Sequence, residues 1–503
     1  MLGVNPEAGL CDDAGRSIPE SPMSTPSLAE PPPRSVESLP GPRGWPWLGN
    51  ALQVRPDRLH LRLEDWARQH GEAYTFRIRD RRFLVVSAPD VVQSVLRRRP
   101  EPFRRSRRLE QAARAFGFLG LFAAHGDTWR RQRPMVLAGL DPAHIRTFFP
   151  ALVDVTQRLR RRWEKAAAAG SVIDVQGDLM RYTVDVTTGL AFGQDVNTLE
   201  KGEGEETIQA HLNVIMPALF RRILAPFDPP EWLRRLRDRE LDQHLQALDV
   251  AVRGFIDRTR QQLEADPSLR EHPLNLIQAM VAARDRTGST VTDDDVSGNV
   301  LTMLLAGEDT TANTLAWMAW LLHRNPEAAA AARAELDRVL AGGRAVTTME
   351  QLAQLDFLEA CANETMRLKP VGPLIINEAT EDTAIGDIRV PRGGLVICLL
   401  RPAAVDGRTF PNPQAFDPWR WQGEAGAAHA LSSAKRHSMP FGAGPRICPG
   451  RYLALTEIKL AAAMLLANFD LLDVSVQGGG EPQERIAIAM SPVGLRMRLR
   501  VRS

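Results

Sequence analysis

The chain has 503 residues, of which 44% are hydrophobic and 25% are charged, and its formal net charge is +2. This balance excludes an intrinsically disordered chain, a collagen-like fibre and a strongly basic nucleic-acid-binding protein. No uninterrupted apolar run approaches the ~18 residues of a membrane-spanning helix. The four cysteines are too scattered for a disulfide framework, so we expect a reducing, cytoplasmic location.

Residues 1–38 contain seven prolines and predict a disordered tail. The segments 73–78 and 82–87 then predict a hairpin of two short strands. Apolar periodicity next predicts helices over 90–98, 127–139, 143–168, 178–191, 205–220, 232–265, 273–284, 293–324, 326–341 and 350–368. Strand-like, glycine-punctuated sequence returns at 383–400, a last helix follows Cys448, and strands are expected at 486–490 and 495–500.

At about 150 residues per domain the length suggests three domains. However, no internal repeat appears and no Pro/Ser-rich linker occurs after residue 50. The sequence therefore predicts one large, mainly α domain with small β-sheets over 39–503, which we expect to be a monomer.

The most informative segment runs from Phe441 to Gly450 and reads FGAGPRICPG. Gly442 and Gly444 allow the backbone to approach a flat group closely. Cys448 and Pro449 stand before a helical pattern, and a helix N-terminus favours thiolate over thiol. A cysteine placed in this way is a candidate metal ligand, although most single cysteines are inert core residues.

This pattern resembles the haem-binding loop of cytochrome P450 enzymes, in which Phe, Gly, Arg, Cys and Gly recur at this spacing. The resemblance implies that Cys448 is the thiolate ligand of a non-covalent haem b. It also implies that Arg446 pairs with a haem propionate and that Phe441 and Gly442 contact the cofactor. The implied fold places haem between the 293–324 helix and the cysteine loop with the 448–467 helix.

Two further motifs support this resemblance. Glu364 and Arg367 lie three residues apart on a helix, a spacing that is typical of surface ion pairs. In the family such a pair is joined by an arginine from a segment like Phe416–Trp421. The resemblance therefore implies a structural triad of Glu364, Arg367 and Arg420 behind the haem loop.

Polar residues interrupt the middle of the 293–324 helix, in the sequence LAGEDTT from Leu305 to Thr311. Such groups are costly in a core helix unless they are satisfied, which favours a function. By resemblance, Ala306 and Gly307 lie over the haem, and Asp309 and Thr310 deliver protons during oxygen activation. Thr311 and Glu308 are candidates to assist this relay, and Glu308 is equally a candidate for a solvated or salt-bridged neighbour.

Trp129 and Arg133 lie four residues apart and share a helix face, which by resemblance reaches a haem propionate. His125 is either a third contact or a structural histidine. Residues 97–133 hold eleven arginines and three acids. This segment is either a solvated basic face or the docking face for an acidic electron donor, a separate ferredoxin or flavodoxin with its reductase.

The sequence also departs from the family pattern. An arginine that contacts a propionate is expected after the Glu-x-x-Arg helix, where this chain has Asn377, and the segment Leu400–Asp406 is altered. The segment 115–126 is apolar and lies, by resemblance, over the substrate. The candidate substrate-pocket residues are Phe116, Phe118, Leu305, Leu374, Ile375 and Met490.

The predicted function is mono-oxygenation of an apolar small organic substrate with O2. A haem-thiolate peroxygenase or dehydratase that does not use O2 is the nearest alternative. A non-enzymatic haem sensor is a more distant one. The pair Asp309–Thr310 favours the monooxygenase over both alternatives.

Overall fold

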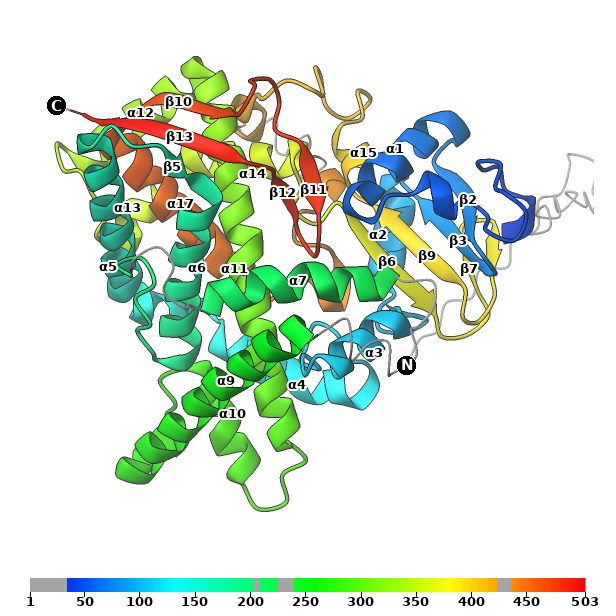
Figure 1. Cartoon of the computed structure of the whole chain (residues 1–503), viewed down its shortest axis with the longest axis horizontal. Helices are drawn as coiled ribbons and strands as arrows, with labels where there is room; N and C mark the ends of the chain where they lie inside the picture. The colour runs from blue at the N-terminus through cyan, green and yellow to red at the C-terminus, as the bar shows by residue number, and fades with distance from the viewer. Residues whose placement is uncertain (1–33, 202–207, 225–238, 423–433, 435, 503) are drawn as a thin grey trace, which may run out of the picture.

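The computed structural model describes residues 34–201, 208–224, 239–422, 434 and 436–502 (Figure 1). Parts of three predicted segments lie outside these residues, namely 1–33 of the tail and 205–207 and 232–238 of two helices. The described chain is mainly helical with small sheets, which confirms the predicted fold class.

The helices set the shape of the molecule and follow the predicted order. They are α1 (Leu59–His70), α2 (Pro89–Arg97), α3 (Arg107–Ala115), α4 (Gly126–Gly139), α5 (Pro142–Ala168), α6 (Val175–Phe192), α7 (Ile208–Leu224), α9 (Arg239–Ala265), α10 (Leu276–Asp285), α11 (Asp293–Arg324), α12 (Pro326–Leu340), α13 (Met349–Ala353), α14 (Asp356–Leu368), α15 (Arg401–Ala404) and α17 (Arg451–Asn468).

The strands of the described segments form four small sheets. They are β1 (Arg34–Ser35), β2 (Ala73–Ile78), β3 (Arg81–Val86), β4 (Phe103–Arg105), β5 (Ile173–Asp174), β6 (Leu374–Ala379), β7 (Thr383–Ile385), β8 (Ile388–Val390), β9 (Leu395–Leu399), β10 (Phe469–Val476), β11 (Glu484–Ile486), β12 (Met490–Pro492) and β13 (Leu495–Val501). The largest sheet has the order β2-β3-β9-β6-β4, and only β3 and β9 pair in parallel.

Helix α11 crosses the middle of the molecule and has the predicted bounds. Thr292 and Asp295 form a capping box at its start, and Asn325 ends it before Pro326. It packs on α6, α14 and α17, and nearly all side chains from Thr311 to Leu322 are buried (Figure 1). This helix therefore provides a rigid support for the polar residues at its centre.

Several predictions were wrong at the level of single elements. Helices α1 and α3 and strands β4, β6 and β10 were not predicted, and the predicted helix 350–368 divides into α13 and α14. The predicted strand 486–490 instead contains the turn between β11 and β12. Local sequence preference specifies such elements only weakly, because tertiary packing supplies most of their stability.

The predicted tail is too long at its C-terminal end. Arg34 and Ser35 pair with Ile388 and Arg389 of β8, and Val36 is buried in the core beside the largest sheet. Residues 34–38 are therefore part of the folded structure.

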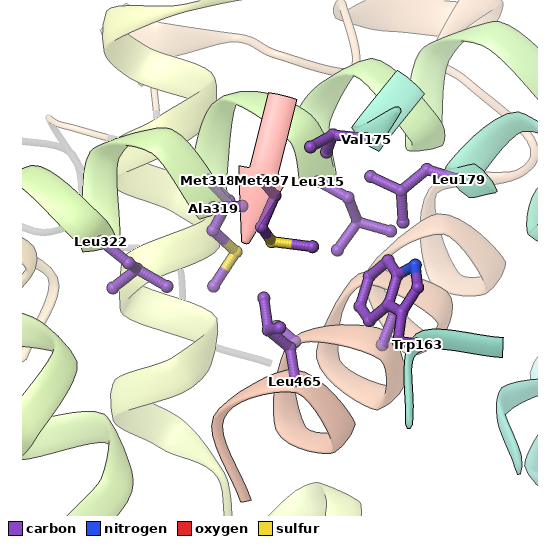
Figure 2. Close-up of a pocket in the computed structure, with 11 residues that line it drawn as sticks. Trp163, Val175, Leu179, Leu315, Met318, Ala319, Leu322, Leu465 and Met497 are labelled. Atoms are coloured by element: carbon purple, nitrogen blue, oxygen red, sulfur yellow. The ribbon is translucent and has the colours of Figure 1, made fainter. Parts of the chain in front are cut away.

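Figure 2 shows apolar side chains from α5, α6, α11, α17 and β13 that point toward one another in the core. Trp163, Leu179, Leu315, Leu465 and Met497 surround a cavity of about 10 Å³ there. A single water needs ~10–15 Å³ and polar partners, so this apolar cavity is dry packing space and not a ligand site.

Candidate active site

The cysteine loop is a compact turn before α17. Gly442 and Gly444 both have φ of 73°, and the Cys448 N–H donates to the Phe441 carbonyl at 3.0 Å. A Cβ on Gly444 would lie 2.5 Å from Cα of Arg97, at the end of α2. The structure thus explains Gly444 by contact with α2, whereas the sequence predicted approach to a flat group.

Cys448 lies where α17 begins, as predicted. Burial nevertheless raises the pKa of its thiol, although the Gly450 N–H and the guanidinium groups of Arg133 and Arg105 lower it. The helix start alone therefore does not make this cysteine a thiolate. A coordinated iron ion would remove the proton, because metal coordination deprotonates a thiol.

The structure brings Trp129, Arg133 and Arg446 together beside this loop. Arg446 Cζ lies 4.7 Å from the Trp129 ring centroid, and its Nη2 donates to the Ala124 carbonyl at 2.7 Å. Arg133 Nη2 donates to the Ile447 carbonyl at 2.8 Å. The α4 helix and the cysteine loop are thus joined through the two predicted propionate contacts.

A third arginine, Arg105 of β4, belongs to this group and was missed by the sequence analysis. Burial, Arg99 and Arg446 lower its pKa well below the ordinary value. Burial and the cations Arg99, Arg104 and Arg133 lower the pKa of Arg446 to about 10. Among the four arginines at 104–108, nothing in the sequence distinguishes this one.

These buried cations fit the two carboxylates of haem. Within the described chain, Arg105 Nε, Arg446 Nε, Arg99 Nη1 and His125 Nδ1 are buried and have no hydrogen-bond partner. Unsatisfied buried cations are unfavourable, so such a group favours an anion that the chain itself does not contribute. We name Arg99, Arg105, Arg133 and Arg446 the guanidinium cluster.

Asn377 does not replace the missing family arginine. Its Nδ2 donates to the Ile375 carbonyl and lies 3.6 Å from Cys398 Sγ. The strand register places Arg105 directly opposite Asn377, and opposed residues of neighbouring strands share one face of the sheet. Arg105 of β4 therefore lies directly across from Asn377 of β6, the position at which the family arginine is missing.

On α11, one face is open in the middle of an otherwise buried helix. Ala306 is exposed, Leu305, Asp309 and Thr310 are half-buried, and Thr310 Oγ1 donates to the Ala306 carbonyl at 2.9 Å. Gly307 faces away from this group, because a Cβ there would lie 2.3 Å from Thr187 Oγ1 on α6. Helix packing, not approach to a cofactor, therefore explains this glycine.

Asp309 is held by neighbours that the sequence analysis missed. Asn313 Nδ2 donates to its carboxylate at 2.6 Å, and the Ala489 N–H donates to it as well. Burial raises the pKa of Asp309 to about 6, while these two hydrogen bonds and Arg485 lower it. A carboxyl with this pKa can release and regain a proton near neutral pH.

Glu308 and Thr311 are both buried, unlike Asp309 and Thr310. Glu308 is buried, burial and Asp309 raise its pKa well above the usual range, and no ion pair to it occurs among the described residues. The Thr311 hydroxyl bonds to Glu457 of α17, and burial raises the pKa of that carboxyl. Glu308 is therefore neither solvated nor salt-bridged, so it is not the kind of neighbour that was the alternative to a role in the relay.

The structure brings Glu364, Arg367 and Arg420 together. Arg367 donates to both Glu364 oxygens at 2.7 Å, and Arg420 Nε donates at 3.0 Å. The Trp421 indole and the Asp417 N–H also donate to Glu364. Glu364 and Arg367 are fully buried, so this is not the surface pair that the spacing alone suggested.

The predicted substrate-pocket residues do not form one group. Phe116, Phe118 and Met490 share a core cluster, and Leu305 packs against it. Leu374 packs near α1 and Ile375 packs in another cluster, because successive strand residues point to opposite faces. Leu374 and Ile375 therefore cannot both line one pocket.

The loop that carries Phe118 is pressed against α11. A Cβ on Gly120 would lie 2.4 Å from the Gly298 carbonyl, and the Leu121 N–H donates to Asn299 Oδ1 at 2.9 Å. The loop is thus fixed two turns before Leu305.

Comparison with known proteins agrees with these features. The cytochrome P450 family model matches residues 39–498. The human mitochondrial 25-hydroxyvitamin D-1 alpha hydroxylase is 28% identical over 87% of each chain. Two relatives come from Streptomyces melanosporofaciens. Cyclooctatin synthase is 29% identical over 85% of this chain and 88% of its own. Cyclooctat-9-en-7-ol 5-monooxygenase is 27% identical over 90% of this chain and 94% of its own.

No helix of the described residues is long and apolar enough to cross a membrane. Family members bind haem b through a cysteine thiolate and act as oxidoreductases that incorporate oxygen from O2. With the family model matching nearly the whole chain, and the cysteine loop, guanidinium cluster and α11 face assembled as described, this chain belongs to the cytochrome P450 family and is a monooxygenase.

Proposed function

We propose that this enzyme inserts one oxygen atom of O2 into an apolar small organic molecule, with electrons from a separate ferredoxin or flavodoxin and its reductase. The observation that carries this proposal is the open face of α11, where Asp309 and Thr310 stand together. An enzyme that does not activate O2 has no need of this acid–hydroxyl pair. The names of the relatives, a vitamin D hydroxylase and two cyclooctatin enzymes, favour a carbon-rich substrate.

The residues would divide the work as follows. Cys448 would ligate the haem iron, and Arg105, Arg133 and Arg446 would hold the propionates. Bound haem supplies the oxygen chemistry, and the thiolate donates electron density to it. Asp309 would exchange protons with solvent, and Thr310, oriented by the Ala306 carbonyl, would pass them to the reacting oxygen.

The basic segment contributes less to partner docking than its composition suggests. Arg130 pairs with Glu101 and Asp127, and Arg131 pairs with Asp295. Arg97 is exposed at the end of α2, beside the cysteine loop. We propose that the donor docks on this side, where a partner would come closest to Cys448. The cytoplasmic location stays a prediction, since one named relative is mitochondrial.

The ligand assignment is tested by Cys448→Ser. We expect the red-shifted absorption of the ferrous–CO complex to disappear completely, because that band requires an axial thiolate. An unchanged band would contradict the assignment of Cys448. A Cys398→Ser variant, which changes a buried cysteine outside this loop, should keep the band.

The relay is tested with Thr310→Ala and a substrate that is identified by the shift it causes in the haem absorption spectrum. We expect O2 consumption to continue while product falls at least tenfold and peroxide replaces it, since proton delivery contributes ~10²–10⁴-fold in enzymes. Thr314→Ala, one turn further along α11, is the control. Fully coupled turnover in Thr310→Ala would favour the peroxygenase or sensor alternatives.

A further inference from the structure

The hairpin β11–β12 reaches the centre of α11 from the C-terminal part of the chain. Its ladder pairs Glu484 with Pro492 and Ile486 with Met490, so the turn residues 487–489 project beyond a fixed register. Strand β12 packs on α11. At the tip, the Ala489 N–H stabilises the charged form of the Asp309 carboxyl, and the next N–H, of Met490, donates to the Val371 carbonyl at 2.7 Å. The backbone of this hairpin therefore contacts the Asp309 carboxyl on one side.

The base of the same hairpin is held by a buried ionic network. Glu484 accepts hydrogen bonds from Arg401 Nη1 at 2.8 Å on both oxygens and from Lys369 Nζ at 2.8 Å. His60 Nε2 lies 3.0 Å from its second oxygen. Arg401 also pairs with Glu64 at 2.7 Å. Three elements, α1, α15 and the end of α14, thus converge on the first residue of β11.

This network also contacts α11 itself. The Lys369 ammonium lies 4.8 Å from the Trp317 ring centroid, two turns beyond Asp309. Both ends of the hairpin therefore contact α11. The tip contacts Asp309, and the base contacts Trp317 through Lys369. The Glu484 side chain is only 8% exposed, so water cannot readily replace these partners.

We propose that the β11–β12 hairpin is a positioning element for proton delivery, in which the Glu484 network sets where the Ala489 N–H holds the Asp309 carboxylate. Glu484 is a positioning residue, because it acts through the hairpin and touches neither substrate nor cofactor. The inference rests on the proposed role of Asp309 and deepens it. Loosening the base lets the tip leave the acid, and the Asp309 carboxylate is then held by Asn313 alone.

The test compares Glu484→Gln with Glu481→Gln in the haem-loaded protein. Glu481 also contacts Lys369 but is 60% exposed, which makes it a matched control. We expect Glu484→Gln to keep the ferrous–CO band and substrate KM. Amide hydrogen exchange of the peptide over 484–492 should accelerate at least tenfold, and peroxide should replace product. Glu481→Gln should match the wild type in each measurement.

A second background separates positioning from general loosening. In Asp309→Asn, which no longer offers the charged acceptor, adding Glu484→Gln should cause no further loss of coupling. Ala489→Pro, which removes the tip N–H and leaves the base intact, should reproduce the uncoupling, and it carries the test if Glu484→Gln fails to fold. Additive losses in the double variant, or wild-type coupling in the variant tested, would overturn the proposal. Wild-type coupling in Asp309→Asn alone would instead overturn the proposed relay.

Discussion

Two regions of this molecule bury charge, and they treat it in opposite ways. Around Glu364, five donors from four residues meet one carboxylate, and Arg367 finds further acceptors in the carbonyls of Ala404, Pro413 and Ala415. At the cysteine loop, by contrast, the guanidinium cluster has no ion pair among the described residues, and on α11 the buried carboxyl of Glu308 has none either.

The difference separates structural residues from functional ones. A matched buried pair needs nothing more, so it fixes chain segments and performs no chemistry. An unmatched buried charge is costly unless a ligand or a proton compensates it. The guanidinium cluster suits an anionic ligand, and Asp309 suits a proton.

The largest effect is expected in the matched region. Arg367→Met leaves Glu364 without its bidentate partner, and breaking a buried pair costs about 3–5 kcal/mol. Urea unfolding of the haem-loaded protein should show this loss in the free energy of unfolding. Arg34→Met, which breaks the exposed pair with Asp387, should change it by less than about 1 kcal/mol. Equal losses in the two variants would remove the distinction between the regions.

The next effect concerns Asp309, whose pKa is raised from 3.8 to about 6 in the folded chain. The folded state binds this proton more tightly than the unfolded state, so stability is highest below pH 4 for this group and falls as pH rises through 6. Asp309→Asn lacks this decline, which amounts to at most about 3 kcal/mol. Unfolding at several pH values checks the difference between the two proteins. Parallel pH curves would contradict the raised pKa.

The smallest effect tests whether Arg105 compensates for Asn377. Arg105→Ala should lose haem to a scavenging protein at least about tenfold faster, because a hydrogen bond to a charged group contributes ~1.5–3 kcal/mol and a factor of ten corresponds to ~1.4 kcal/mol. Adding Asn377→Arg should slow the loss again, because the two positions oppose each other. Arg114→Ala, at an exposed position of α3, is the control. An unchanged rate in Arg105→Ala would exclude it from the propionate site.

The sequence predicted helix ends and motifs, which depend on residues close together along the chain. It did not predict contacts between segments that are far apart in the sequence. The bounds of α11 were predicted because Thr292, Asp295 and Pro326 mark its ends. Cys448, Arg446, Trp129 and Arg133 were predicted because motif spacing carries them. Arg105, Asn313 and Ala489 were not, because their contacts depend on strand register or on a backbone N–H that no residue type reveals. Leu374 and Ile375 were both predicted to line the substrate pocket. The resemblance places their segment of the chain but does not show toward which face of the sheet each side chain points.

The close contact between Gly120 and Gly298 has a consequence for redesign of the enzyme. Neither residue tolerates even a methyl group, so a substitution at that contact would displace the loop that carries Phe118 from α11. Phe116 and Phe118, whose rings lie 6.3 Å apart in the same loop, are positions at which side-chain volume can be changed without a clash at that contact. If this loop lies over the substrate, as the resemblance implies, these two side chains are where substrate preference can be altered.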